Sequence, residues 1–206
     1  RHAIGQHDFQ MRWRAAGRAR ANVGGSFSKS VGATQWVKRI STDADYYIFG
    51  RIARQTVSLT GRFDLSFTPE LSLQVYAQPF VSAGRYSGFK QLADPLADDF
   101  VDRFTALRPD VVDGAYQTDV DADGEPESID NPDFNSKQFR SNAVLRWEYS
   151  PGSRLFAVWS HGRQHFASDG EFNLADDLGT LFDAQAENVF MLKLSHWLDP
   201  YAVLGE

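Results

Sequence analysis

The clearest pattern in the sequence is a strict alternation of apolar and polar residues between Val57 and Phe67. In an extended strand, residues two positions apart share a face, so the apolar side chains lie on one side and the polar ones on the other. A turn over Thr68, Pro69 and Glu70 follows, and the alternation resumes at Leu71. The pattern therefore predicts a β-hairpin with one apolar and one polar face.

Similar alternation recurs near the start of the chain, again after residue 138, and in the closing segment. Together these runs predict about seven strands, at 8–15, 19–31, 54–67, 71–86, 138–149, 153–165 and 188–198. Consecutive strands joined by short turns favour antiparallel pairing with the nearest neighbour. We therefore expect an all-β, antiparallel up-and-down meander.

Long polar connections, at 32–51, 87–136 and 167–187, alternate with the short turns. Compact soluble domains rarely carry several structureless loops longer than about 12–15 residues, whereas outer-membrane barrels pair short periplasmic turns with long extracellular loops. Aromatic residues also gather near the short turns, as in the interfacial girdle of such barrels: Trp13, Phe67, Trp147, Tyr149 and Trp197. The sequence thus predicts part of a transmembrane outer-membrane β-barrel.

Composition removes several alternatives. The mean hydropathy is −0.40, and no run of about eighteen apolar residues exists, so a transmembrane helix is excluded. The net charge is −6, without the concentrated basic face of a nucleic-acid-binding protein.

In a barrel, the charged residues on the second face of the strands would line a wet lumen. The expected lumen-facing residues are Arg12, Arg14, Arg20, Arg62, Asp64, Arg146, Glu148 and Lys193.

Three stretches carry a resemblance to a known family: "LQVYAQPFVSAGRYSGFKQL", "DNPDFNSKQFRSNAVLRWEYSPGSRLFAVWSHGR" and "NVFMLKLSHWL". They are similar to the C-terminal barrel of a bacterial surface family described as domain of unknown function 5916. That barrel follows modules similar to family-nine carbohydrate-binding modules. The resemblance implies a bacterial outer-membrane location, insertion into the lipid bilayer by the barrel-insertion machinery and an N-terminal partner module, and it implies no activity.

Seven strands would not close a barrel by themselves, since bacterial single-chain barrels have an even number of strands, eight or more. We therefore expect residues 1–206 to form one C-terminal barrel segment of a longer chain.

One loop segment, "DVDADGEPESID", has the spacing of a calcium-binding loop. The expected ligands are Asp119, Asp121, Asp123, Glu125 and Asp130, with Glu127 at the position that often binds through water and Gly124 at the turn. No helices flank the loop in the predicted fold, and Asp130 is shorter than the usual bidentate Glu. The alternative is an acidic loop that is merely solvated.

No nucleophile elbow, phosphate-binding glycine loop or zinc-type spacing occurs, so we expect a non-enzymatic protein. Two function classes follow. The first is a barrel segment that anchors a surface protein or lets a hydrophilic solute, such as a carbohydrate, pass. The second is a soluble all-β module that binds glycans by stacking sugars on Tyr86, Phe89 and Tyr116.

Overall fold

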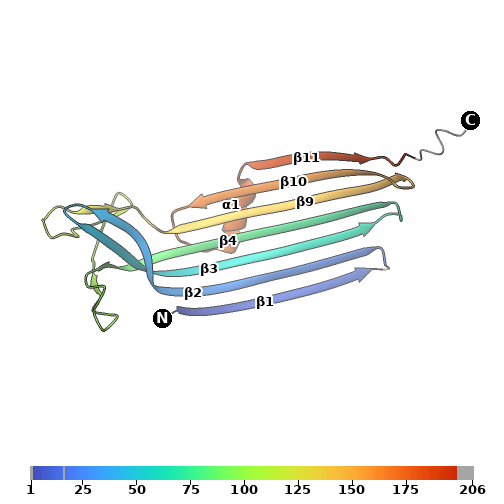
Figure 1. The fold of residues 1–206 in the computed structure, drawn as a ribbon. Helices are drawn as coiled ribbons and strands as arrows, with labels where there is room; N and C mark the ends of the chain where they lie inside the picture. The colour runs from blue at the N-terminus through green and yellow to red at the C-terminus, as the bar shows by residue number, and fades with distance from the viewer. Residues whose placement is uncertain (1, 16, 199–206) are drawn as a thin grey trace, which may run out of the picture.

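A computed structural model describes residues 2–15 and 17–198 of the chain. Seven long strands form one antiparallel sheet in the order β1-β2-β3-β4-β9-β10-β11 (Figure 1). Their bounds are β1 His2–Ala15, β2 Ala19–Ser41, β3 Asp45–Ser66, β4 Leu71–Leu92, β9 Phe134–Ser150, β10 Ser153–Ala167 and β11 Ala186–Ser195. The prediction of an all-β antiparallel meander is confirmed. The sheet is open, because β1 and β11 each pair with one neighbour within the described residues.

Tight turns between β1 and β2, β3 and β4, and β9 and β10 lie together at one end of the sheet (Figure 1). The sequence explains two of these turns. In the β9–β10 turn, Gly152 adopts a φ of 76°, a conformation that costs glycine little and other residues more. In the β3–β4 turn, the Thr68 hydroxyl oxygen accepts hydrogen bonds from the backbone N–H groups of Glu70 and Leu71. We call this end of the sheet the turn end and the opposite end the loop end.

The prediction of a polar loop at 32–51 is wrong. This segment continues β2 and β3 as one long hairpin that pairs as far as Ser41 opposite Asp45. The register shifts between Gly32 and Gln35 and again between Trp36 and Lys38. Such bulges add an unpaired residue and exchange the two faces locally, which is why the period-two pattern breaks off although the strand does not.

The other two expected loops contain structure of their own. The 87–136 segment includes the end of β4, then β5 (Phe104–Ala106), which pairs with β4, and a small sheet of β6 (Asp110–Val112), β7 (Ala115–Thr118) and β8 (Glu127–Ile129). The 167–187 segment contains one helix, α1 (Leu174–Asp183). α1 contacts β4, β9 and β10, and it is too short to span a membrane.

A hydrophobic core cluster lies at the loop end, where the distal β2–β3 hairpin meets the small sheet. It consists of Ile40, Ile48, Phe89, Val120 and Ile129. Over most of its length the long sheet is a single layer with both faces largely uncovered (Figure 1).

Candidate functional site

All eight residues predicted to line a lumen lie on one face of the long sheet. Residues directly opposite each other in antiparallel strands share a face, and the register connects the strands in turn. Arg14 lies opposite Arg20, Arg20 opposite Asp64, and Asp64 opposite Gln74. Across the remaining strands, Gln74 lies opposite Val144, Arg146 opposite Phe156, and Phe156 opposite Lys193. We call this side the polar face.

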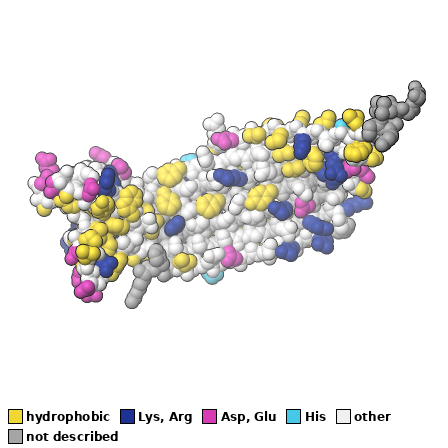
Figure 2. All heavy atoms as spheres, viewed as in Figure 1, with side chains coloured by type: hydrophobic (Ala, Val, Ile, Leu, Met, Phe, Trp, Pro, Cys, Tyr) yellow, Lys and Arg dark blue, Asp and Glu magenta, His cyan; other side chains and the backbone are white. Residues whose placement is uncertain are grey.

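The polar character is strongest over β1 to β4. On β10 and β11 the same face also carries apolar side chains, among them Val158 and Met191. Figure 2 shows Lys and Arg side chains gathered toward the turn end of the sheet and Asp and Glu side chains around the loops at the opposite end. The charge is therefore divided along the length of the molecule.

The opposite side, which we call the apolar face, exposes large hydrophobic side chains. Phe190 is 76% exposed and Leu192 is 74% exposed. The others are Phe9, Met11, Trp13, Val23, Leu145, Trp147, Trp159 and Leu194. On β3 the apolar residues of this face run from Val57 to Leu65, which at about 3.4 Å per residue is a band of about 27 Å. Beyond it Gln55 follows on the same face.

Four arginines line an open depression of about 540 Å³ on the polar face: Arg12, Arg14, Arg20 and Arg62. The lining also includes the neutral residues Gln10, Asn22, Gly24, Thr60 and Tyr76. The guanidinium carbon of Arg62 lies 5.9 Å from the centre of the Tyr76 ring, within the range of a cation–π contact. None of the four arginines has a carboxylate within 4.0 Å in the described part of the chain.

Glu148 forms the second charged group of this face. Its carboxylate accepts hydrogen bonds from Arg146 at 2.8 Å and from Arg154 at 3.1 Å. Asp64 lines a smaller neighbouring depression with Arg62, and Lys193 stands apart on β11. The structure thus places four of the predicted residues around an arginine-lined depression and two, Arg146 and Glu148, in an ion-pair cluster with Arg154. Sequence reasoning missed this distinction.

Aromatic side chains surround the β9–β10 turn. Tyr149 stacks on His196, with ring centres 6.1 Å apart and an angle of 6° between the planes, and its hydroxyl lies 2.9 Å from the imidazole Nδ1. Trp147 packs edge-on against Tyr149, and the backbone N–H of Trp197 donates to the Ser153 hydroxyl. The turn end therefore carries a cluster of amphipathic aromatic groups.

The acidic loop does not assemble the ligand set that its spacing suggested. Asp119, Asp121 and Glu127 bring one carboxylate oxygen each within 4.8 Å of one another. Asp130 instead pairs with Lys38 at 3.6 Å, and Asp123 accepts the backbone N–H of Glu125.

Backbone geometry explains this grouping. The chain turns at Ala122 and Gly124, which have positive φ angles. Their N–H groups donate to Asp119. A hydrogen bond from the Thr42 side chain lowers the pKa of Asp121 below its ordinary value, so its charged form is favoured.

Tyr86, Phe89 and Tyr116, predicted as a sugar-stacking platform, pack together at the loop end. Phe89 is only 4% exposed, and its ring centre lies 4.7 Å from that of Tyr116. Tyr86 packs against the same cluster. The buried Phe89 ring cannot stack on a sugar, whereas Tyr86 and Tyr116 are half-buried, so the three rings do not form one exposed platform.

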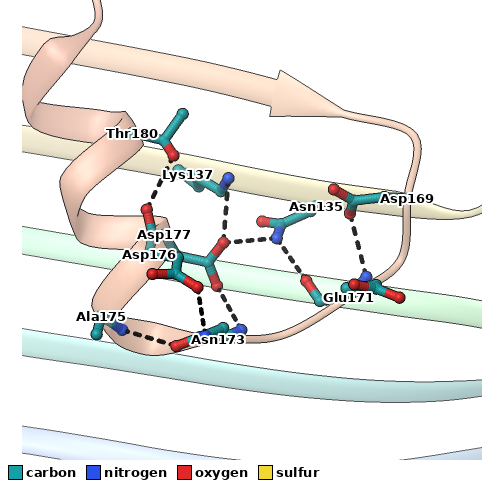
Figure 3. A network of polar contacts seen from close by, with 9 residues as sticks. All are labelled: Asn135, Lys137, Asp169, Glu171, Asn173, Ala175, Asp176, Asp177 and Thr180. Atoms are coloured by element: carbon teal, nitrogen blue, oxygen red, sulfur yellow. Dashed lines mark hydrogen bonds and ion pairs between the residues drawn. The ribbon is translucent and has the colours of Figure 1, made fainter.

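A buried polar network holds α1 on the apolar-face side of the sheet, near its loop end (Figure 3). Asp177 of α1 pairs with Lys137 of β9 at 3.0 Å, with the two side chains 5% and 6% exposed. The same carboxylate accepts from the Asn135 amide at 2.7 Å and from the Asn173 backbone N–H at 3.0 Å.

Sequence reasoning missed this helix and its network. The available signal was the "NLADDLGTLF" stretch, with an Asn N-cap, two acidic residues in the first turn and apolar residues at helical spacing.

Comparison with known proteins yields one family. A family model described as "Domain of unknown function (DUF5916)" matches residues 2–204. Searches of curated proteins and of solved structures give no match. The family match covers all the described strands.

Proposed function

The chain belongs to the family described as Domain of unknown function (DUF5916), and from that premise and the geometry of the sheet we propose that it forms part of a bacterial outer-membrane β-barrel. In this proposal it is not an enzyme. It anchors a surface protein in the outer membrane or lets a hydrophilic solute, such as a carbohydrate, pass along its polar face.

The exposed apolar face is the observation that carries the proposal. Water-soluble monomers rarely expose contiguous apolar patches larger than a few hundred Å². Here large apolar side chains are exposed on β1, β2, β9, β10 and β11. Lipid tails would cover these side chains without loss of hydrogen bonds. In a lipid-facing strand every second side chain is apolar, and these are the side chains that face lipid.

Dimensions support the same conclusion. The apolar band of about 27 Å on β3 agrees with the lipid-facing band of about 25 Å in outer-membrane barrels. β2 has 23 residues, about twice the 9–11 that cross a bilayer, so the sheet would project beyond the membrane at its loop end. Trp13, Trp147 and Tyr149 near the turn end would lie at the periplasmic interface.

Barrel closure requires partners for the open edges of β1 and β11, because no unpaired backbone groups are tolerated in lipid. We propose that further strands, beyond the seven long ones, supply this pairing. The partners of the chain in this proposal are the bilayer itself, the barrel-insertion machinery and an N-terminal carbohydrate-binding-like module.

We also propose that Asp119, Asp121 and Glu127 hold a structural calcium ion. Hard carboxylate oxygens suit calcium, and one oxygen from each of the three carboxylates lies within 4.8 Å of the others. The affinity expected for such an exposed site is about 10⁻⁴ to 10⁻³ M. The ion would order the loop without taking part in signalling or catalysis.

The proposal is tested by purification with and without detergent, and by matched arginine substitutions. Leu59 lies on the apolar face and its neighbour Ser58 on the polar face. An arginine facing lipid costs about 2–4 kcal/mol near the bilayer midplane, so Leu59→Arg is expected to reduce the folded fraction in liposomes far more than Ser58→Arg. A protein that stays monodisperse without detergent, or equal effects of the two variants, would refute the membrane assignment.

A further inference from the structure

We propose that the depression lined by Arg12, Arg14, Arg20 and Arg62 binds a small solute carrying phosphate or carboxylate groups. This inference rests on the proposed function and deepens it, because it assigns the chemical class of the solute that the polar face recognises. The lining of the depression includes four arginines and no carboxylate.

Cross-strand repulsion is the first observation. Arg14 and Arg20 are direct partners in the β1–β2 ladder, where Cβ atoms lie about 4.5–5.5 Å apart and like charges are unfavourable. Arg12 and Arg62 both lie opposite Asn22, one from each neighbouring strand. Four guanidinium groups therefore border one recess, and a bound anion would relieve their repulsion.

The lack of internal compensation is the second observation. Asp64 is the carboxylate opposite Arg20 in the register, yet it lines the neighbouring depression with Arg62 and pairs with neither arginine within 4.0 Å. On the same face, Arg146 and Arg154 are both engaged by Glu148. Among residues 2–15 and 17–198, the four arginines thus keep their hydrogen-bond donors available for a ligand, whereas Arg146 and Arg154 do not.

The surrounding groups define the ligand class. A guanidinium presents its donors in a planar fork that matches carboxylate and phosphate oxygens. Gln10, Asn22, Thr60 and Tyr76 add neutral polar groups to the lining, which suit hydroxyl groups of the same solute. A recess of about 540 Å³ falls within the range of small-molecule sites, about 300–1,000 Å³. The geometry fits a phosphorylated or carboxylated small molecule of about the size of a sugar.

Calorimetric titration of inorganic pyrophosphate into the full chain in a neutral detergent tests the site without competition from lipid headgroups. The double variant Arg14→Gln/Arg20→Gln should weaken binding at least about tenfold, since bonds to charged groups are among the strongest polar contacts. The matched control Arg146→Gln/Arg154→Gln removes two positive charges from the same face and should change binding less than about threefold.

Arg14→Lys/Arg20→Lys provides a second variant that keeps the positive charges but lacks the planar fork of guanidinium donors. Its affinity for pyrophosphate should lie between those of the wild type and of Arg14→Gln/Arg20→Gln. Circular dichroism in the same detergent checks that each variant keeps its β-sheet. Wild-type protein that binds no pyrophosphate at millimolar concentration overturns the anion site. An equal loss of affinity in the two Gln variants also overturns it.

Conductance in planar bilayers separates this site from the proposed function. If the site and passage are both correct, pyrophosphate reduces the wild-type current, and the Arg14→Gln/Arg20→Gln variant is blocked less. Pyrophosphate binding without any current supports the site and rejects passage. Current that pyrophosphate leaves unchanged, together with no binding, supports passage and rejects the site.

Discussion

Replacing Asp177 by alanine should release α1 from the sheet, because this carboxylate is the centre of the buried network at the loop end. It compensates the charge of Lys137 at 3.0 Å and accepts from Asn135 at 2.7 Å and from the backbone of Asn173 at 3.0 Å. Both charged side chains are at most 6% exposed. The Asp177→Ala variant would leave an ammonium group buried without a partner.

The magnitude follows from the burial. Removing one partner of a buried ion pair typically costs about 3–5 kcal/mol, because the remaining charge has lost both water and its counter-charge. Since about 1.4 kcal/mol corresponds to a factor of ten, the equilibrium for opening α1 should shift by about a hundredfold or more. Lys137 and Asn135 belong to β9 and should stay in the sheet, so the effect is expected to be local.

Hydrogen exchange of the α1 backbone amides measures this shift. Asp176→Ala provides the matched control: it removes a carboxylate from the same first turn, but one that is exposed. Its loss should cost about 0.3–1 kcal/mol through the helix dipole. A second variant, Lys137→Met/Asp177→Leu, replaces the ion pair by apolar groups of similar size and should restore most of the protection.

Two outcomes would refute this reasoning about α1. Protection factors in the Asp177→Ala helix within about threefold of wild type would mean that the ion pair does not hold α1. Equal losses of protection in Asp177→Ala and Asp176→Ala would mean that any carboxylate in the first turn stabilises α1 and that burial of the ion pair adds nothing.

Two predictions concern the acidic loop. In calorimetric titration with calcium, Asp121→Asn/Glu127→Gln should abolish the heat seen at millimolar calcium, whereas Asp123→Asn/Asp130→Asn should keep it; the reverse order would reject the ligand set. Without calcium, the loop should lose order as the pH falls below about 3.9, the ordinary pKa of an Asp, because the Thr42 hydrogen bond lowers the folded-state pKa of Asp121. A carboxyl with a depressed folded pKa stabilises the fold above the unfolded pKa and loses that contribution as it is protonated. Protection factors of the loop amides that are unchanged between pH 5 and pH 3 would contradict this pH prediction.

The sequence predicted the sheet well where the strands are regular. Between Val57 and Phe67 the alternation has no interruption, and the placement of Arg62 and Asp64 on one face follows from local geometry. The same holds for Arg12, Arg14 and Arg20. Where bulges occur, as after Gly32, the alternation loses its phase, and the outer half of the β2–β3 hairpin was predicted as a loop.

The sites were predicted less completely than the faces. The spacing of Asp119 and Asp121 indicated a cation loop, but Glu127 belongs to the group and Asp130 does not. Glu127 is the first residue of strand β8, so its approach to Asp119 depends on the path of the whole loop. Tyr86, Phe89 and Tyr116 lie in or near a predicted connection, where the sequence indicates exposed rings, and their mutual packing depends on the small sheet.

The sequence by itself determined the period of the strands, the residues that share a face and the family to which the chain belongs. These are local properties, because side-chain direction in a strand depends only on the parity of the position. Only the tertiary structure decided which charges are compensated. Arg14 meets Arg20, Glu148 meets Arg146 and Arg154, and Asp177 meets Asn135 across 42 positions of chain. Such contacts depend on strand register and on the course of the connections, and neither is encoded in the spacing of the residues themselves.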